Sequence, residues 1–186
     1  IGEKAFYAAL YGAHPYGLPG AGKIETLTTL LRQDVAAFYR RHYVAEAAVI
    51  SLVGDVSRAQ AETIADQLSA GLPRAAAPLP ALPEISSTVP GETLRIAHPA
   101  SQSHILLGTP GMSRKDPDYF ALFIGNYILG GGGFASRLTD EVREKRGLAY
   151  SVYSYFLPLA QPGPFQIGLQ TKQEQSQQAL DLVRAT

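Results

Sequence analysis

The sequence predicts an α+β fold, in which helices pack on one face of a sheet. Its 186 residues carry 46% apolar and 17% charged side chains, an ordinary globular composition. Apolar residues recur at helical spacing in several segments, and most strand-like segments gather in the second half of the chain. Strands and helices segregated in this way favour a layer of helices on a sheet.

The first half of the sequence predicts three helices, whose apolar positions recur every three or four residues. They are expected at residues 1–11, 27–43 and 57–71. Thr28 or Thr29 is expected to cap the second helix and Ser57 the third, because a hydroxyl can accept from the first free backbone N–H groups. Gly71 is expected to end the third helix.

The strand-like segments are short and rich in β-branched or aromatic residues. One continuous apolar run, bounded by Gly-Asp, predicts a buried strand over residues 47–56. Further strands are expected at residues 92–99, 101–111, 148–158 and 163–172. In the segment 148–158 the side chains alternate, so Tyr150 and Val152 are expected to point one way and Tyr153 the other.

The second half also predicts helices over residues 116–131 and 135–146 and a final helix after residue 172, in which Ala179, Leu180 and Val183 recur at helical spacing. Asp116 is expected to cap the first of these, and Gly147 to end the second. The first has a broad apolar face, which we expect to be buried. This face consists of Phe120, Phe123, Ile124, Tyr127 and Ile128.

A composition shift divides the chain into two parts. Residues 73–91 hold five prolines and little periodicity, which is typical of an extended, semi-rigid linker. We therefore expect one structural region over residues 1–72 and another over 92–186. The chain begins with Ile1 and its last helical pattern has no terminal cap, so we expect it to be a piece of a longer protein.

Charge and cysteine content narrow the function classes. The 16 basic and 16 acidic residues give a net charge of zero, which offers no field for nucleic acid. No apolar run reaches the length of a membrane span. Cysteine is absent, which excludes disulfides and thiolate ligands. With no targeting segment in this sequence, the periplasm and the cytoplasm of a bacterium both stay open as locations.

The run Gly130, Gly131, Gly132 and Gly133 resembles a phosphate-binding loop at first sight. A Walker loop requires Lys-Ser or Lys-Thr after the glycines, and a dinucleotide loop requires a preceding strand. Here the glycines follow a helix and lead into Phe134 and a second helix. The run is therefore interpreted as a hinge between helices, whose entropic cost a close backbone approach would offset.

Metal and hydrolase motifs are absent from the sequence. The four histidines are His14, His42, His98 and His104, and none has the spacing of H-E-x-x-H or H-x-x-E-H. We therefore expect no complete metal site in this chain. No G-x-S-x-G segment is present either, which disfavours a serine nucleophile.

The pair Arg143 and Tyr150 has a spacing that suggests a shared site. The residues are seven apart, and a helix end at Gly147 would bring both side chains to one place. Arg and Tyr donors together can hold a peptide carbonyl or a developing oxyanion. Each residue alone also has a structural explanation: Arg143 at the helix C-terminus and Tyr150 as a core aromatic.

Three segments resemble the pitrilysin family of zinc peptidases. "LGGGGFASRLTDEVREKRGLAYSVYSYF" is similar to the Arg/Tyr segment of that family. "HPYGLPGAGKIETLTTLLRQDVAAFYRRHYVAEAAVISLVGDV" and "SHILLGTPGMSRKDPDYFALFIGNYILGG" resemble two further family segments in the same order. The family includes insulysin, the mitochondrial processing peptidases and the core subunits of the cytochrome bc1 complex.

The resemblance implies a two-layer architecture of sheet and helices, of the processing-peptidase type. Family members pair two similar α+β domains. Residues 1–72 would be the end of the first, 73–91 the linker, and 92–186 much of the second, truncated at its C-terminus.

The resemblance also implies that this chain lacks the metal half of an active site. The family holds zinc through H-x-x-E-H and a downstream Glu, none of which is present here. Zinc is then expected in an upstream domain or a partner subunit. The chain alone is expected to be inactive, and to work in a homo- or heterodimer with a zinc-bearing homologue.

The family's catalytic Arg and Tyr match Arg143 and Tyr150, whose implied role is to bind an extended peptide and stabilise the tetrahedral intermediate. The segment from Gly130 to Phe134 is implied to be a mobile substrate-binding hinge. The alternative is a purely structural relative, similar to the core subunits of a respiratory complex.

Overall fold

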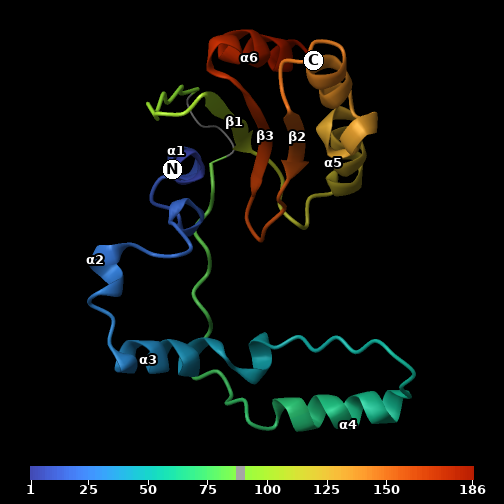
Figure 1. The fold of residues 1–186 in the computed structure, drawn as a ribbon. Coiled ribbons are helices and arrows are strands. Elements are labelled where there is room, and N and C mark those ends of the chain that lie inside the picture. The colour runs from blue at the N-terminus through green and yellow to red at the C-terminus, as the bar shows by residue number, and fades with distance from the viewer. Residues whose placement is uncertain (87–90) are drawn as a thin grey trace. The chain divides into compact units, whose positions relative to one another are not determined.

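The computed structural model describes residues 1–86 and 91–186 (Figure 1). The chain forms two compact units, one of residues 1–20 with 82–186 and the other of residues 21–81. These units do not follow the predicted regions, because residues 1–20 pack with the second half of the chain. The family domain boundaries at residues 72 and 92 stay a prediction.

The larger unit is built on a three-stranded antiparallel sheet in the order β1-β3-β2. The strands are β1 (Gln102–Pro110), β2 (Ser151–Phe156) and β3 (Pro164–Lys172). Gly168 of β3 is the centre of the register, opposite Leu106 of β1 and Tyr153 of β2. The predicted strands at 101–111, 148–158 and 163–172 are therefore confirmed.

The core lies between one face of this sheet and the helices that flank it. Helix α6 (Ser176–Ala185) buries Ala179 and Val183, one turn apart, as its predicted spacing requires. They join a single apolar cluster contributed by the strands and by the helical segment before Gly147. The other members are Leu138, Val142, Leu148, Ala149, Val152 and Leu169.

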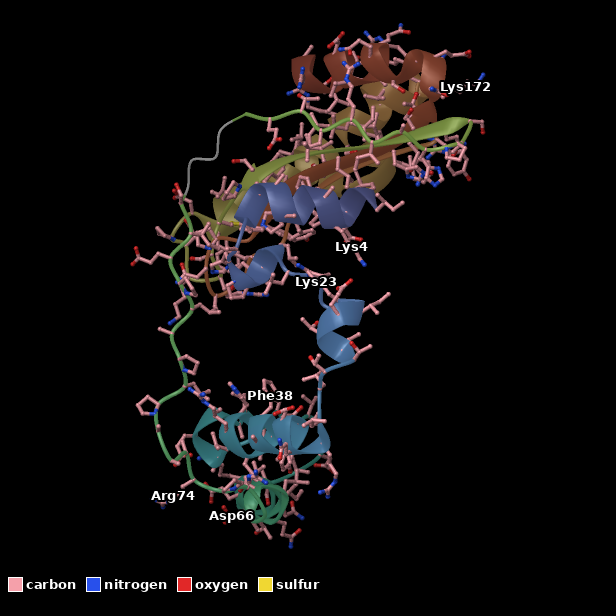
Figure 2. All side chains as sticks on the ribbon, turned by 90° about the vertical axis from the view of Figure 1, so that its left-hand side faces the viewer. Lys4, Lys23, Phe38, Asp66, Arg74 and Lys172 are labelled. Atoms are coloured by element: carbon pink, nitrogen blue, oxygen red, sulfur yellow. The ribbon has the colours of Figure 1, made fainter. Side chains whose placement is uncertain are left out.

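The opposite face of the sheet carries α1 (Gly2–Tyr11), a predicted helix that is confirmed. Figure 2 shows α1 and α6 on opposite sides of β1. A Cβ added at Gly108 of β1 would lie 2.6 Å from the Phe6 ring, so the glycine lets this helix approach closely. The Tyr11 hydroxyl donates to the Pro162 carbonyl at 3.3 Å, and Tyr7 approaches Tyr155 of β2.

The smaller unit contains helices and no strand. Its helices are α2 (Ile24–Leu27), α3 (Arg32–His42) and α4 (Arg58–Ser69), with a short 3-10 turn, η2 (Ala45–Ala47). Ser57 caps α4 as predicted, since its Oγ accepts from the Gln60 N–H at 3.4 Å. The expected helix over 27–43 is interrupted at Leu31, whose extended backbone precedes α3 and whose N–H donates to Asp34. Thr28 and Thr29 are therefore not its caps.

Two predicted strands are wrong. Residues 47–56 and 92–99 form no strand, and the side chains of Val49, Val53, Leu94 and Ile96 are exposed. An apolar run becomes a strand only where another strand satisfies its backbone groups. The unit of residues 21–81 offers no such strand, and in the described part of the larger unit the sheet ends at β1 and β2, neither of which pairs with residues 92–99.

The predicted burial of one helix face is also wrong. The segment 116–131 forms α5 (Tyr119–Asn126) and a π-helical turn, η3 (Tyr127–Gly131), but its aromatic face is exposed, Phe120 at 75%. Asn126, Leu129 and Gly130 face the sheet instead. The helical period was right, but a different face is turned inwards: Leu129 packs on the core, and Asn126 and Gly130 lie close to β2.

The remaining short turns complete the larger unit. They are η1 (Pro15–Gly17), η4 (Gly133–Ala135), η5 (Thr139–Glu144, a π-helical segment) and η6 (Gln173–Gln175). The expected helix over 135–146 is thus a 3-10 turn followed by helical residues 137–144. Asp116 accepts from the Asp118 N–H at 3.0 Å just before α5 begins, and Asp118, not Asp116, is the residue that precedes the first turn.

Candidate functional site

The glycine run begins by packing tightly on the edge of the sheet. A Cβ at Gly130 would lie 2.4 Å from the Ser154 Oγ and 2.6 Å from its backbone nitrogen. Beside it, Asn126 and Ser154 exchange two hydrogen bonds: Ser154 Oγ to Asn126 Oδ1 at 2.7 Å, and Asn126 Nδ2 to the Ser154 carbonyl at 3.2 Å. Glycine at position 130 therefore allows the chain to approach β2 closely. Gly131 and Gly132 also leave no room for a side chain, because Asn126 of α5 and Tyr127 of η3 lie against them.

The end of the glycine run is a fixed turn that presents Phe134. Gly133 has a φ of 59°, a left-handed conformation that favours glycine. The buried Ser136 donates its hydroxyl to the Gly133 carbonyl at 2.7 Å and lies 3.0 Å from the Thr139 hydroxyl. These bonds hold the turn, and the Phe134 ring it carries is 75% exposed.

A second turn, at Gly147, reverses the chain from η5 into β2. Gly147 has a φ of 60° and its N–H donates to the Arg143 carbonyl at 2.9 Å, while the Leu148 N–H donates to the Val142 carbonyl at 2.9 Å. These bonds satisfy the last carbonyls of the helical segment. The predicted helix end at Gly147 is therefore confirmed.

The two turns bring Arg143, Phe134 and Tyr150 together. The guanidinium carbon of Arg143 lies 4.9 Å from the centroid of the Phe134 ring and 5.7 Å from that of Tyr150. Both distances are within the range of cation–π attraction. Tyr150 is 80% exposed, which excludes the explanation of a core aromatic.

Neighbouring charges are paired among themselves. Lys145 Nζ lies 2.7 Å from carboxylate oxygens of both Asp140 and Glu141, and Arg146 also contacts Glu141. Hydrogen bonds from Lys145, and then from Arg146, lower the pKa of Glu141 to about 2. Among the described residues, Arg143 forms an ion pair outside this group, with Glu144, whose Oε1 lies 3.4 Å from Nε.

The arrangement offers donors to an acceptor at the surface. The Arg143 guanidinium has N–H donors in one plane, and the Tyr150 hydroxyl adds a rotatable donor. The Arg143 side chain is 35% exposed, so both groups face solvent. Such donors can bind a carbonyl oxygen or a negative oxygen that develops from it.

The sequence predicts that Arg143 and Tyr150 share one place, but it does not predict two other features of the site. The first is the ring of Phe134 over Arg143, and the second is the Asn126–Ser154 pair that fixes the glycine run on β2. The sequence spacing of residues 134 and 143 does not predict their contact, because this contact depends on the turn at Gly133 and on the π-helical widening of η5.

Comparison with known proteins identifies the family. The family model described as the peptidase M16 inactive domain matches residues 29–186. The chain belongs to the M16 peptidase family. This M16 chain is 34% identical over 184 residues to an uncharacterized zinc protease of Streptomyces coelicolor, covering 96% of the chain and 40% of the relative. The chain therefore spans about two fifths of that relative's length.

Solved structures agree on the fold. The crystal structure of a peptidase M16 inactive domain from Pseudomonas fluorescens superposes with a TM-score of 0.94 at 43% identity, covering 98% of this chain and 44% of that one. A chain of complex III2 from Candida albicans shares the fold at 18% identity, with a TM-score of 0.73 and coverage of 92% and 42%. The predicted fold class and the family resemblance are confirmed.

The M16 family implies zinc, and the residues of this chain do not fit it. Within the described residues no group of three His, Cys, Asp or Glu side chains is placed to hold a metal ion. His14 instead accepts from the Tyr16 N–H at Nδ1 and lies 3.1 Å from the Pro83 carbonyl at Nε2. In the same described part, no helix is long and apolar enough to cross a membrane.

Proposed function

We propose that this chain is a non-zinc M16 domain that supplies Arg143 and Tyr150 to a zinc endopeptidase assembly. The observation that carries the proposal is the half-buried Arg143 side chain, whose guanidinium carbon lies 5.7 Å from the centroid of the exposed Tyr150 ring. Membership of the M16 family, through its inactive-domain model, supports a role beside a zinc-bearing unit. The partner is a homologous domain or subunit, and the assembly is a homo- or heterodimer.

The proposed ligand is the backbone of an extended peptide. Arg143 and Tyr150 donate to one of its carbonyl oxygens and hold it in position. When the carbonyl is attacked, its oxygen gains negative charge, and the same donors bind that charge more strongly than the neutral carbonyl. Residues Gly130–Phe134 border this position, and the backbone of this segment is proposed to contact the substrate.

Substitution of Tyr150 by Phe in the assembled enzyme tests this role. The full-length protein and its zinc-bearing partner are assayed together on a peptide, with a chelator control that must abolish cleavage. We expect turnover to fall by roughly 10²–10³, the scale of one lost oxyanion donor. Tyr153→Phe is the matched control, since Tyr153 lies on β2 next to Gly168 and is not part of the Arg143 cluster.

A structural role is the second candidate function. The observation that favours it is the fold shared with a chain of complex III2 from Candida albicans. The two substitutions Tyr150→Phe and Arg143→Ala, once verified, each remove hydrogen-bond donors from the site. If neither changes the turnover of the assembly, the catalytic proposal is wrong. The scaffold function then stands.

A further inference from the structure

We infer that Phe134 is a positioning residue that holds the Arg143 guanidinium for its ligand, an inference that rests on the proposed function of Arg143. The Phe134 ring is the nearer of the two aromatic rings, with its centroid 4.9 Å from the guanidinium carbon against 5.7 Å for Tyr150. Phe134 comes from the turn after the glycine run, and Tyr150 from the far side of the Gly147 turn.

Burial does not explain Phe134. Its ring is 75% exposed and it is not a member of the apolar core cluster. Leaving a phenylalanine in water forfeits the free energy that its burial would give. The contact with Arg143 recovers part of this, because the ring lies against the guanidinium of a side chain that is 35% exposed.

Hydrogen bonds and a glycine turn hold the backbone that carries Phe134, which positioning requires. Gly133 is held in the left-handed region at φ 59°, and its carbonyl accepts from both the backbone N–H of Ser136, at 3.1 Å, and its hydroxyl, at 2.7 Å. Ser136 and Thr139 are buried. A fixed ring limits the rotamers of a long arginine side chain before the ligand arrives, so less entropy is lost on binding.

The choice of an aromatic ring also keeps the donors of Arg143 free. A phenyl ring attracts a cation through its face but accepts no conventional hydrogen bond, so it does not compete with a peptide carbonyl for the N–H groups. A carboxylate in this place would pair with the guanidinium and neutralise it. The nearest carboxylate is that of Glu144, whose Oε1 lies 3.4 Å from Nε at the edge of the guanidinium and not over its face, while Glu141 is engaged by Lys145 and Arg146.

A double-mutant cycle in the assembled enzyme tests the inference. Phe134→Leu is expected to lower kcat/KM about 2–5-fold, the scale of an exposed cation–π contact. Phe134→Tyr keeps an aromatic ring and is expected to retain the kcat/KM of the unsubstituted enzyme. In an Arg143→Ala background, Phe134→Leu is expected to have no further effect, because it acts through Arg143. The matched control is Phe120→Leu, since Phe120 is also 75% exposed but lies on α5.

The outcomes separate the two proposals. If Arg143→Ala lowers turnover but Phe134→Leu does not, the positioning role is wrong and the proposed function stands. If Phe134→Leu has the same effect with and without Arg143, the ring contacts substrate directly and the inference is overturned. If Arg143→Ala has no effect on turnover, the proposed function fails. The positioning role is then tested by the mobility of the Arg143 side chain, measured from the nuclear relaxation of its Nε–H signal. Unchanged nuclear relaxation of that signal in Phe134→Leu overturns positioning, and increased mobility supports it.

Discussion

At the scale of single residues, glycine identity is set by contacts that lie far away in the sequence. Gly130 has no room for a side chain because Ser154 of β2 lies against it, whereas Gly133 and Gly147 are fixed by their positive φ. Glycine is thus required for a different reason at different positions of the run. The hinge role predicted for it is compatible with only part of this set, since Gly130 is clamped between Ser154 and Leu138.

Gly130→Ala is expected to lower the free energy of unfolding by about 1–3 kcal/mol, the cost of forcing atoms into a packed site. The added Cβ would lie 2.6 Å from the backbone nitrogen of Ser154, which cannot move without disturbing β2. Urea unfolding measures the change. Gly125→Ala is the control: no atom lies within 4 Å of its Cβ, so this helix position is expected to gain roughly 0.5–1 kcal/mol. Equal effects from both substitutions would contradict the packing explanation.

At the scale of elements, charged side chains cluster at the C-terminal end of the helical segment η5. Lys145 and Arg146 lie where the helix dipole favours cations, and both contact Glu141. The pairs are exposed, so their contribution to stability is modest and screened by salt. They nevertheless keep these side chains together, next to the turn that carries Arg143 towards Tyr150.

This cluster predicts a loss of order in acid. The folded protein lowers the pKa of Glu141 to about 2, through hydrogen bonds from Lys145 and Arg146. A lowered pKa means that the stabilisation is fully present above the ordinary value of 4.5 and is lost as the pH falls through about 2. The protection of the amides of residues 139–147 from hydrogen exchange, measured relative to the intrinsic exchange rate at each pH, is expected to fall over this range. In Glu141→Gln the acid dependence should be absent, and an unchanged profile in that variant would exclude this cause.

At the scale of the whole molecule, α1 belongs structurally to a sheet that begins some ninety residues later. Phe6, Tyr7 and Tyr11 bring an aromatic cluster onto the face of the sheet that α6 does not cover. The Tyr16 hydroxyl adds a hydrogen bond from the Gln161 N–H, at 3.2 Å. Residues 1–20 are therefore fastened to the larger unit by rings and hydroxyls.

These tyrosines predict a weakening of the α1 contact in strong alkali. Burial, and then the neighbouring Tyr7, raises the pKa of Tyr155 to about 12, and burial also raises that of Tyr11. The neutral forms are favoured in the folded state, so their stabilisation is full below the ordinary pKa of 10 and is lost as the pH rises through about 12. Ultraviolet absorbance of phenolate should show late-titrating tyrosines. Tyr155→Phe should remove one of them, and a titration unchanged by this substitution would refute the assignment.

Local patterns in the sequence were sufficient for much of the fold. The spacing of Ala179 and Val183 gave α6, the hydroxyl of Ser57 gave the start of α4, and Gly147 gave the end of η5. The strands β1, β2 and β3 followed from apolar runs bounded by turn residues. The pairing of Arg143 with Tyr150 followed from the same glycine, because a reversal at a known position limits where the next residues can lie.

Only the tertiary structure decided which of these segments have partners. The runs at 47–56 and 92–99 have the composition of strands but no strand beside them, and the face of Phe120 and Ile124 has the period of a core helix but points outwards. The composition and period of a segment indicate which side chains it could bury. The elements that lie beside it in the folded chain determine which side chains it does bury. For the same reason the sequence supplied Arg143 and Tyr150, and the folded turns at Gly133 and Gly147 added Phe134.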